Sequence, residues 1–236
     1  MQKFRWFLWW AIIVLWVLGL VFLVRSIQMY PGGTALSMHD EGFSFSENVF
    51  MELGRMQAYN LESNVEGETY WVRFLLLSGL GMTILHLMWL LNMRVHQARL
   101  WAGAAFLLVG LGAFHSYGLR LYPFDTAYPK FLMFWERMAG GYALGALATG
   151  LAMKIEPDCK RFHAYAWWGA GILALIQWVL LKWGPEMWSS HQSLMMHAVL
   201  EKCVFLAYVF VWLIHLRLRY TKLRKSKKGK AAVSSA

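Results

Sequence analysis

The chain has 236 residues, of which 58% are hydrophobic and only 15% are charged, and it carries a net charge of +10. This composition excludes an ordinary soluble domain with a charged surface, and it leaves little sequence for a separate catalytic domain. We find no dinucleotide-binding, P-loop or nucleic-acid-binding motif, so we expect no nucleic-acid partner.

Six apolar runs follow one another along the chain. A helix needs about 20 mostly apolar residues to cross the hydrocarbon of a bilayer, and it satisfies its backbone polar groups internally. The runs lie at about residues 5–26, 71–94, 101–121, 132–154, 163–183 and 194–216. The sequence therefore predicts an all-α, polytopic integral membrane protein, with six transmembrane helices in one bundle over residues 1–216 and a basic cytoplasmic tail over residues 217–236.

The segments between the runs alternate in charge. Basic residues precede the first run, lie between the second and third and between the fourth and fifth, and follow the sixth, whereas the segment 27–70 is strongly acidic. Because short cytoplasmic loops are enriched in Lys and Arg, both termini are expected in the cytoplasm and the segment 27–70 outside an inner (plasma) membrane. The first run is longer than a signal-peptide core and is expected to be an uncleaved anchor.

The acidic segment is the largest element predicted outside the membrane. Its turn at Tyr30-Pro31-Gly32-Gly33 should end the first helix. From Ser44 onward, apolar residues recur at helical spacing, and Ser44 with Glu47 fits a capping box. We therefore expect an amphipathic helix of about four turns at the outer membrane surface.

The C-terminal tail and the two cysteines carry simpler predictions. Eight of the 23 basic residues lie between Arg217 and Lys230, a stretch without any acid, so the tail is expected to attract anionic lipid headgroups. Cys159 lies in a predicted cytoplasmic loop and Cys203 in the outer half of the sixth run. Because the two cysteines lie at different depths, no disulfide is expected.

Ionisable residues inside the runs are costly in lipid and usually face a partner, a cavity or a pathway. Most of them lie in the outer halves of three runs: His115 and Arg120 in the third, Glu136 and Arg137 in the fourth, and His197, Glu201 and Lys202 in the sixth. In the sixth run, His197, Glu201, Tyr208 and His215 share one narrow helical sector. The third, fourth and sixth helices are expected to converge on an outer polar pocket, with Glu201, Glu136 and Arg137 as its candidate catalytic residues.

A ridge of small residues in the fourth run indicates that another helix can approach it closely. Gly141, Gly145 and Thr149 recur at four-residue spacing in the fourth run. Such small residues allow another helix to pack closely.

Four interpretations of the polar pocket remain open. Haem b could be ligated by His115 and His197 at similar depth, with His86 as a candidate on the inner side. A metal ion could bind His197 and Glu201, which are four residues apart on one face, together with His115. Glu201 and Glu136 could relay protons or bind a transported solute, or the charges could simply pair with one another.

These observations favour a multi-pass subunit of a larger membrane assembly, with other membrane subunits and the lipid bilayer as its partners. Haem b or quinone-linked electron transfer is the most specific functional hypothesis. A membrane-embedded metal-dependent enzyme and a proton- or solute-coupled transport component are the alternatives.

Overall fold

The computed structural model describes residues 2–35, 37–122, 124–183 and 190–233, with side chains described from residue 4 to residue 215 within these ranges. The described chain is built from six α-helices and one short 3₁₀ helix, η1. Their bounds are α1 Gln2–Met29, η1 Phe50–Gly54, α2 Val65–Asn92, α3 His96–Leu121, α4 Phe124–Ile155, α5 Arg161–Trp183 and α6 His191–Val233. The six apolar runs predicted from the sequence thus correspond one to one with the six α-helices.

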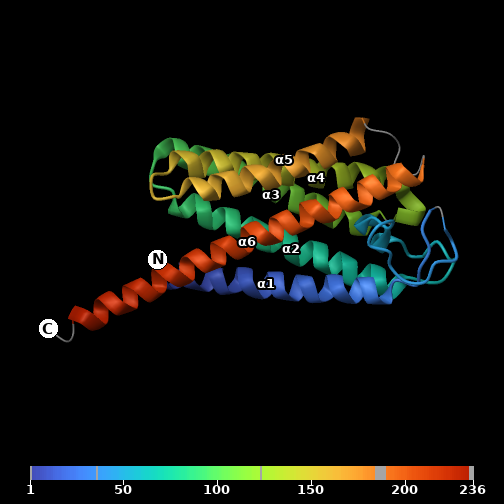
Figure 1. Cartoon of the computed structure of the whole chain (residues 1–236), viewed down its shortest axis with the longest axis horizontal. Helices are drawn as coiled ribbons and strands as arrows, with labels where there is room; N and C mark the ends of the chain where they lie inside the picture. The colour runs from blue at the N-terminus through green and yellow to red at the C-terminus, as the bar shows by residue number, and fades with distance from the viewer. Residues whose placement is uncertain (1, 36, 123, 184–189, 234–236) are drawn as a thin grey trace.

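The helices form one elongated bundle in which neighbours in sequence are neighbours in space (Figure 1). Both chain ends lie at one end of the bundle, which we call the tail end, and residues 30–64 cover the opposite end, which we call the loop end. Beyond the apolar part of α6, its helical backbone continues to Val233 and projects away from the bundle.

Helix α6 closes the bundle by contacting helices far from it in sequence. Its Trp212 stacks on Trp16 of α1, with ring centroids 5.4 Å apart. Its Phe205 meets Phe74 of α2 edge to face at 5.9 Å. Helix α6 therefore lies across α1 and α2 as well as beside α5.

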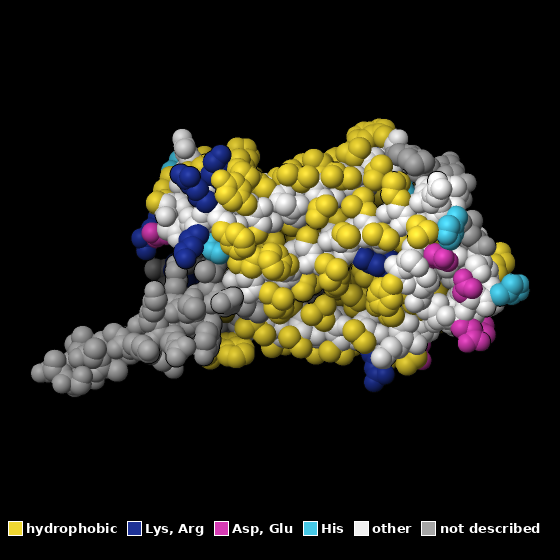
Figure 2. Space-filling model, in the orientation of Figure 1, with side chains coloured by type: hydrophobic (Ala, Val, Ile, Leu, Met, Phe, Trp, Pro, Cys, Tyr) yellow, Lys and Arg dark blue, Asp and Glu magenta, His cyan; other side chains and the backbone are white. Residues whose placement is uncertain are grey.

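Five described helices are long and apolar enough to cross a membrane: α1 from Phe4, α2, α3, α5, and α6 as far as His215. Helix α4 is less apolar because it is rich in glycine and alanine and carries charged residues near its start. Figure 2 shows a broad apolar belt around the middle of the visible face, with a cluster of Lys and Arg side chains at the tail end, a few more toward the loop end, and Asp and Glu side chains mainly at the loop end. Such a belt is typical of a surface that contacts lipid tails.

Two helices begin several residues before their apolar runs. Helix α2 starts at Val65 because Glu66 and Glu68 in its first turn complement the positive end of the helix dipole. Helix α4 starts at Phe124 but is kinked at Ala127, whose φ of −141° and ψ of 39° are not helical. Pro129 follows the kink, in the first turn of the straight part, where its missing N–H costs no hydrogen bond.

Glycines bring α3 and α4 into close contact. A Cβ atom added to Gly141 would lie 2.8 Å from the carbonyl oxygen of Leu108 and 3.0 Å from the Cα of Gly112. The two backbones therefore touch where the glycine ridge of the fourth run was predicted to allow it.

The expected four-turn amphipathic helix is not found in residues 30–64. The described segment forms turns, two isolated β-bridges and only the five-residue η1. Of the apolar residues at helical spacing, Val49 and Leu53 are 1% and 0% exposed, whereas Phe45 and Met56 are 59% and 40% exposed. The segment folds irregularly because the side chains of Asn48 and Glu52 accept hydrogen bonds from its backbone N–H groups.

Candidate functional site

Residues 30–64, which we call the cap, fold around a buried asparagine. Asn48 is fully buried, and its Nδ2 donates to the carbonyl oxygen of Gly33 at 2.9 Å and to Oε2 of Glu52 at 2.7 Å. Its Oδ1 accepts from the N–H of Ser44 at 2.7 Å. Glu52 also reaches back to accept from the N–H of Val49 at 3.2 Å, at the start of η1. Asn48 and Glu52 thus replace the predicted capping box of Ser44 and Glu47.

Two adjacent residues of α6 hold the cap onto the bundle. The buried carboxylate of Glu201 accepts a hydrogen bond from the backbone N–H of Phe50 in η1. The ammonium group of Lys202 donates to the carbonyl oxygen of Asn48 at 2.5 Å and to that of Ala198 at 3.1 Å. Lys202 also lies over the ring of Phe50, with 5.3 Å between the nitrogen and the ring centroid. The cap is therefore held to α6 by a carboxyl group that accepts from one backbone N–H and by an ammonium group that donates to a backbone carbonyl.

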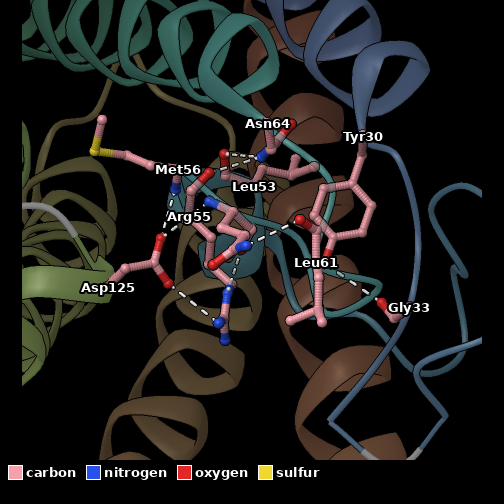
Figure 3. Close-up of polar contacts among 9 residues, drawn as sticks. Tyr30, Gly33, Leu53, Arg55, Met56, Leu61, Asn64 and Asp125 are labelled. Carbon is pink, nitrogen blue, oxygen red and sulfur yellow. Dashed lines mark hydrogen bonds and ion pairs between the residues drawn. The ribbon is translucent and has the colours of Figure 1, made fainter.

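A second anchor joins the cap to the start of α4 (Figure 3). Asp125 accepts from the N–H groups of Met56 and Gln57 at 2.6 and 3.2 Å and forms an ion pair with Arg55 at 3.1 Å. Within the cap, Nδ2 of Asn64 donates to the carbonyl oxygen of Arg55 at 2.8 Å. The cap is thus fixed to both α4 and α6.

Two tyrosines of the cap stay in their neutral form. Burial raises the pKa of Tyr30 and of Tyr59 well above the ordinary phenol value, and the nearby carboxylate of Glu52 raises both further. Tyr30 donates from its hydroxyl group to the carbonyl oxygen of Gly33 at 3.4 Å. The guanidinium of Arg55 lies 4.0 Å from the ring centroid of Tyr59. These phenols therefore act as hydrogen-bonding groups of the cap at neutral pH.

A cavity of about 140 Å³ lies between the helices beneath the cap. Its walls are mainly aromatic and apolar, and the described residues that line it come from η1, α1, α2, α4, α5 and α6. Phe50 of η1 lines it from the cap, and Trp71 of α2 stacks on Trp135 of α4 with ring centroids 5.6 Å apart. Glu201 and Gln177 bring polar groups to the same cavity. None of the described lining residues belongs to α3.

The predicted polar sector of α6 is buried. His197, Glu201 and His215 are 2%, 6% and 2% exposed, and Tyr208 donates from its hydroxyl group to the carbonyl oxygen of Tyr142 at 2.7 Å. The residues of this sector do not all belong to one site, however. Glu201 and Tyr208 line the cavity, whereas His215 belongs to a separate group of side chains nearer the tail end.

The third helix does not join the fourth and sixth around the cavity as expected. His115 is half-buried on α3, where its Nδ1 lies 2.6 Å from the carbonyl oxygen of Leu111 and its ring packs against Phe134 of α4. Glu136 is half-buried and Arg137 is exposed, and neither forms an ion pair with another described residue. Helices α2 and α5 instead line the cavity together with α1, α4 and α6.

The candidate metal ligands His115, His197 and Glu201 are not gathered in one place. Across the described parts of the chain, no three His, Cys, Asp or Glu side chains form a group that could hold a metal ion. The spacing of His197 and Glu201 places them on one face of α6, but a third ligand would have to come from another helix, and sequence spacing alone does not determine which helices meet.

The structure brings together three histidines that the sequence did not connect. His86 of α2 and His215 of α6 both pack against Trp167 of α5, with ring centroids 5.1 and 5.8 Å from it. Trp167 donates from Nε1 to Nε2 of His215 at 2.7 Å, and His163 lies 5.6 Å from His215. Nδ1 of His86 is 2.8 Å from the carbonyl oxygen of Met82. Trp167 thus fills the space between His86 and His215.

Sequence reasoning also missed Asn48, Glu52 and Gln177. The first two are four residues apart and flank apolar residues, which is a signal that both could be buried together. Gln177 is the single polar residue within a long apolar stretch of the fifth run, and it is 7% exposed. A neutral amide attracts less notice than a charge, but it too is costly inside an apolar bundle unless it is hydrogen-bonded.

Comparison with protein-family models, curated proteins and solved structures finds no match to this chain. The class of protein is nevertheless defined by the helices themselves and by their apolar surfaces. It is an all-helical, multi-pass membrane protein whose described helices line a cavity beneath a folded cap.

Proposed function

We propose that the protein binds a small, mainly apolar molecule in the cavity between the cap and the bundle. The observation that carries this proposal is the cavity itself, which joins apolar walls to a few polar groups that can orient a ligand. A pocket of this kind is the usual form of a small-molecule site in a helical bundle. Its volume of about 140 Å³ is close to that of an engineered protein cavity of about 150 Å³ that binds benzene.

Within this proposal, Glu201 has two roles. Its carboxylate holds the N–H of Phe50, and it also lines the cavity, so that it couples the cap to the ligand. A ligand that enters or leaves the cavity would meet Phe50 and thereby change the contacts of the cap. The protein would then sense or carry a molecule dissolved in the membrane, which agrees with a role as a subunit of a larger membrane assembly or of a transport system.

The proposed orientation places the loop end outside the cell and the tail end in the cytoplasm of an inner membrane. Its support is the distribution of charge along the chain and on the visible surface, which follows the positive-inside rule (Figure 2). In this orientation residues 1–216 form the membrane domain, and the basic tail 217–236 meets the anionic lipids of the cytoplasmic leaflet. The ligand would bind in the outer half of the membrane.

Electron transfer through haem b receives less support than binding of a quinone-class or other small ring. None of the described residues lining the cavity is a histidine. Nε2 of His215 accepts from Trp167, and the ring of Trp167 packs against both His86 and His215. Haem ligation by His86 and His215 together would therefore require Trp167 to move.

The proposal can be tested with toluene as a single-ring probe and the purified protein in lipid nanodiscs. Val204 lines the cavity and is 9% exposed, whereas Leu206, two residues further on the same helix, is 62% exposed. Toluene should raise the thermal unfolding midpoint of the wild-type protein and of Leu206→Phe, because a ligand that binds only the folded state stabilises it. It should not do so for Val204→Phe, whose larger side chain fills the cavity. Equal shifts in all three proteins would overturn the proposal.

A further inference from the structure

The polar groups that line the cavity differ in whether they already have hydrogen-bond partners. Ser78 donates to the carbonyl oxygen of Leu75 at 3.3 Å, and Tyr208 donates to that of Tyr142 at 2.7 Å. Glu201 accepts from the N–H of Phe50. Gln177, from α5, lines the same cavity and is 7% exposed, yet its amide makes no hydrogen bond to another described residue. The indole N–H groups of Trp16 and Trp71, which also line the cavity, have no hydrogen-bond partner either, but they are fully buried. Among the described lining residues, the amide of Gln177 is therefore the polar group without a partner that a ligand can reach.

The amide of Gln177 can be reached from the cavity, because its atoms are not among the fully buried polar atoms that lack a partner. A polar group in an apolar cavity gains from a hydrogen bond to the molecule that occupies the cavity. The Gln177 side chain offers both a carbonyl acceptor and two N–H donors. A ligand group that can donate and accept at the same atom, such as a hydroxyl, would satisfy both kinds of site.

The walls of the cavity indicate the shape of the ligand. Trp71 and Trp135 stack with an interplanar angle of 19°, and Phe205 meets Phe50 edge to face with ring centroids 5.6 Å apart. Aromatic side chains favour offset stacking or edge contacts with another ring. Since the volume corresponds to about one six-membered ring, a single aromatic ring is the body that suits these walls.

The charges around the cavity argue against a cationic ligand. The carboxylate of Glu201 is the one acidic group among the described lining residues, and the ammonium group of Lys202 follows it directly in the chain. The N–H of Phe50 also points at this carboxylate. A second cation in the cavity would have to compete with both.

From these observations we infer that the ligand is a hydroxylated single-ring molecule, of the phenol or quinol class, whose hydroxyl group is bound by Gln177. This inference rests on the proposed function and adds the chemical class of the ligand to it. A free phenol and the head group of a membrane quinol share this chemistry.

The test compares toluene with p-cresol, which is the same ring with one added hydroxyl group, in nanodiscs and by calorimetry. Gln177→Leu should weaken p-cresol binding about tenfold, the effect of one lost hydrogen bond, and should leave toluene binding unchanged. Retained toluene binding also shows that the variant is folded, and Gln177→Met provides a second variant. Gln97→Leu, at an exposed position of α3, should change neither affinity.

Further probes distinguish a free phenol from a membrane quinol and show which results would overturn the inference. Decylhydroquinone with the same dependence on Gln177 would identify a membrane quinol, whereas binding of p-cresol alone would identify a free phenol. If toluene binds but Gln177→Leu leaves p-cresol unaffected, or if benzylamine binds more tightly than p-cresol, the hydroxyl inference is overturned while the proposed function stands. If none of these rings binds the wild-type protein, the proposed function itself fails.

Discussion

Three carboxylates in this protein bind backbone N–H groups of segments that are distant in the chain. Glu201 accepts from Phe50, Asp125 accepts from Met56 and Gln57, and Glu156 accepts from Arg94 and Val95 at 2.8 and 3.2 Å. Glu156 thereby satisfies N–H groups at the start of α3, which have no partner within the helix. Glu156 and Glu201 are buried, at 3% and 6% exposed, and each connects two segments that are distant in the chain.

The role of Glu201 leads to a prediction about stability. Glu201→Leu leaves the buried N–H of Phe50 without an acceptor, which should lower the free energy of unfolding by about 1–3 kcal/mol. Glu201→Gln keeps an acceptor oxygen and should lose less. Thermal unfolding in detergent, together with hydrogen exchange at the Phe50 amide, measures both effects.

A matched control is Glu136→Gln, because Glu136 is half-buried and forms no ion pair with another described residue. We expect this variant to unfold at nearly the wild-type temperature. A Glu201→Leu protein with wild-type stability and an equally protected Phe50 amide would contradict the anchoring role of Glu201.

At the scale of the helices, packing depends on which positions lack a side chain. Helices α3 and α4 approach closely at Gly112 and Gly141, where any Cβ would meet the opposite backbone. In a membrane, such close contact is a principal source of helix association, because lipid tails are as apolar as the helix surfaces. By contrast, a Cβ atom on Gly169 of α5 would have no neighbour within 4 Å.

Gly141 and Gly169 should respond in opposite ways to substitution by alanine. Gly141→Ala should destabilise the protein by about 1–3 kcal/mol, since the backbones of α3 and α4 must move apart. Gly169→Ala should be neutral or stabilising by up to about 1 kcal/mol, because alanine has the higher helix propensity and meets no obstacle. Denaturant unfolding of both variants in the same detergent tests the pair. Similar changes in stability at both positions would show that the close approach of α3 and α4 at Gly141 does not control the effect.

At the scale of the whole molecule, the chain is polarised along the bundle axis. Both termini lie at one end and the folded cap lies at the other (Figure 1). The cap contacts α4 through Asp125 and α6 through Glu201 and Lys202. The position of the cap over the cavity therefore depends on helices from separate parts of the chain.

This polarity predicts the outcome of a topology experiment. A reporter inserted at Glu41, which is exposed in the cap, should be active only outside the cell, and one fused after Lys230 only in the cytoplasm. Each insertion should be made with reporters specific for each compartment. The six-span arrangement requires an odd number of membrane crossings between the two insertion sites. Activity of both insertions on the same side would show that this number is even, and the six-span arrangement would be wrong.

The sequence by itself determined the helices and the class of protein. Hydropathy is a local property, so each of the six apolar runs predicts its helix without reference to the others. The buried sector of α6 and the glycine ridge of α4 also follow from spacing within one helix, and both are found in the structure.

Only the tertiary structure decided the cap and the cavity. The hydrogen bond between Phe50 and Glu201 joins residues 151 positions apart, and that between Met56 and Asp125 joins residues 69 positions apart. No periodicity within residues 30–64 reports such partners, which is why a helix was expected where η1 and turns are found. Likewise, neither His115 nor Glu136 is among the described residues that line the cavity. Gln177 does line it, and spacing within one helix could not assign that position because the cavity is formed by several helices.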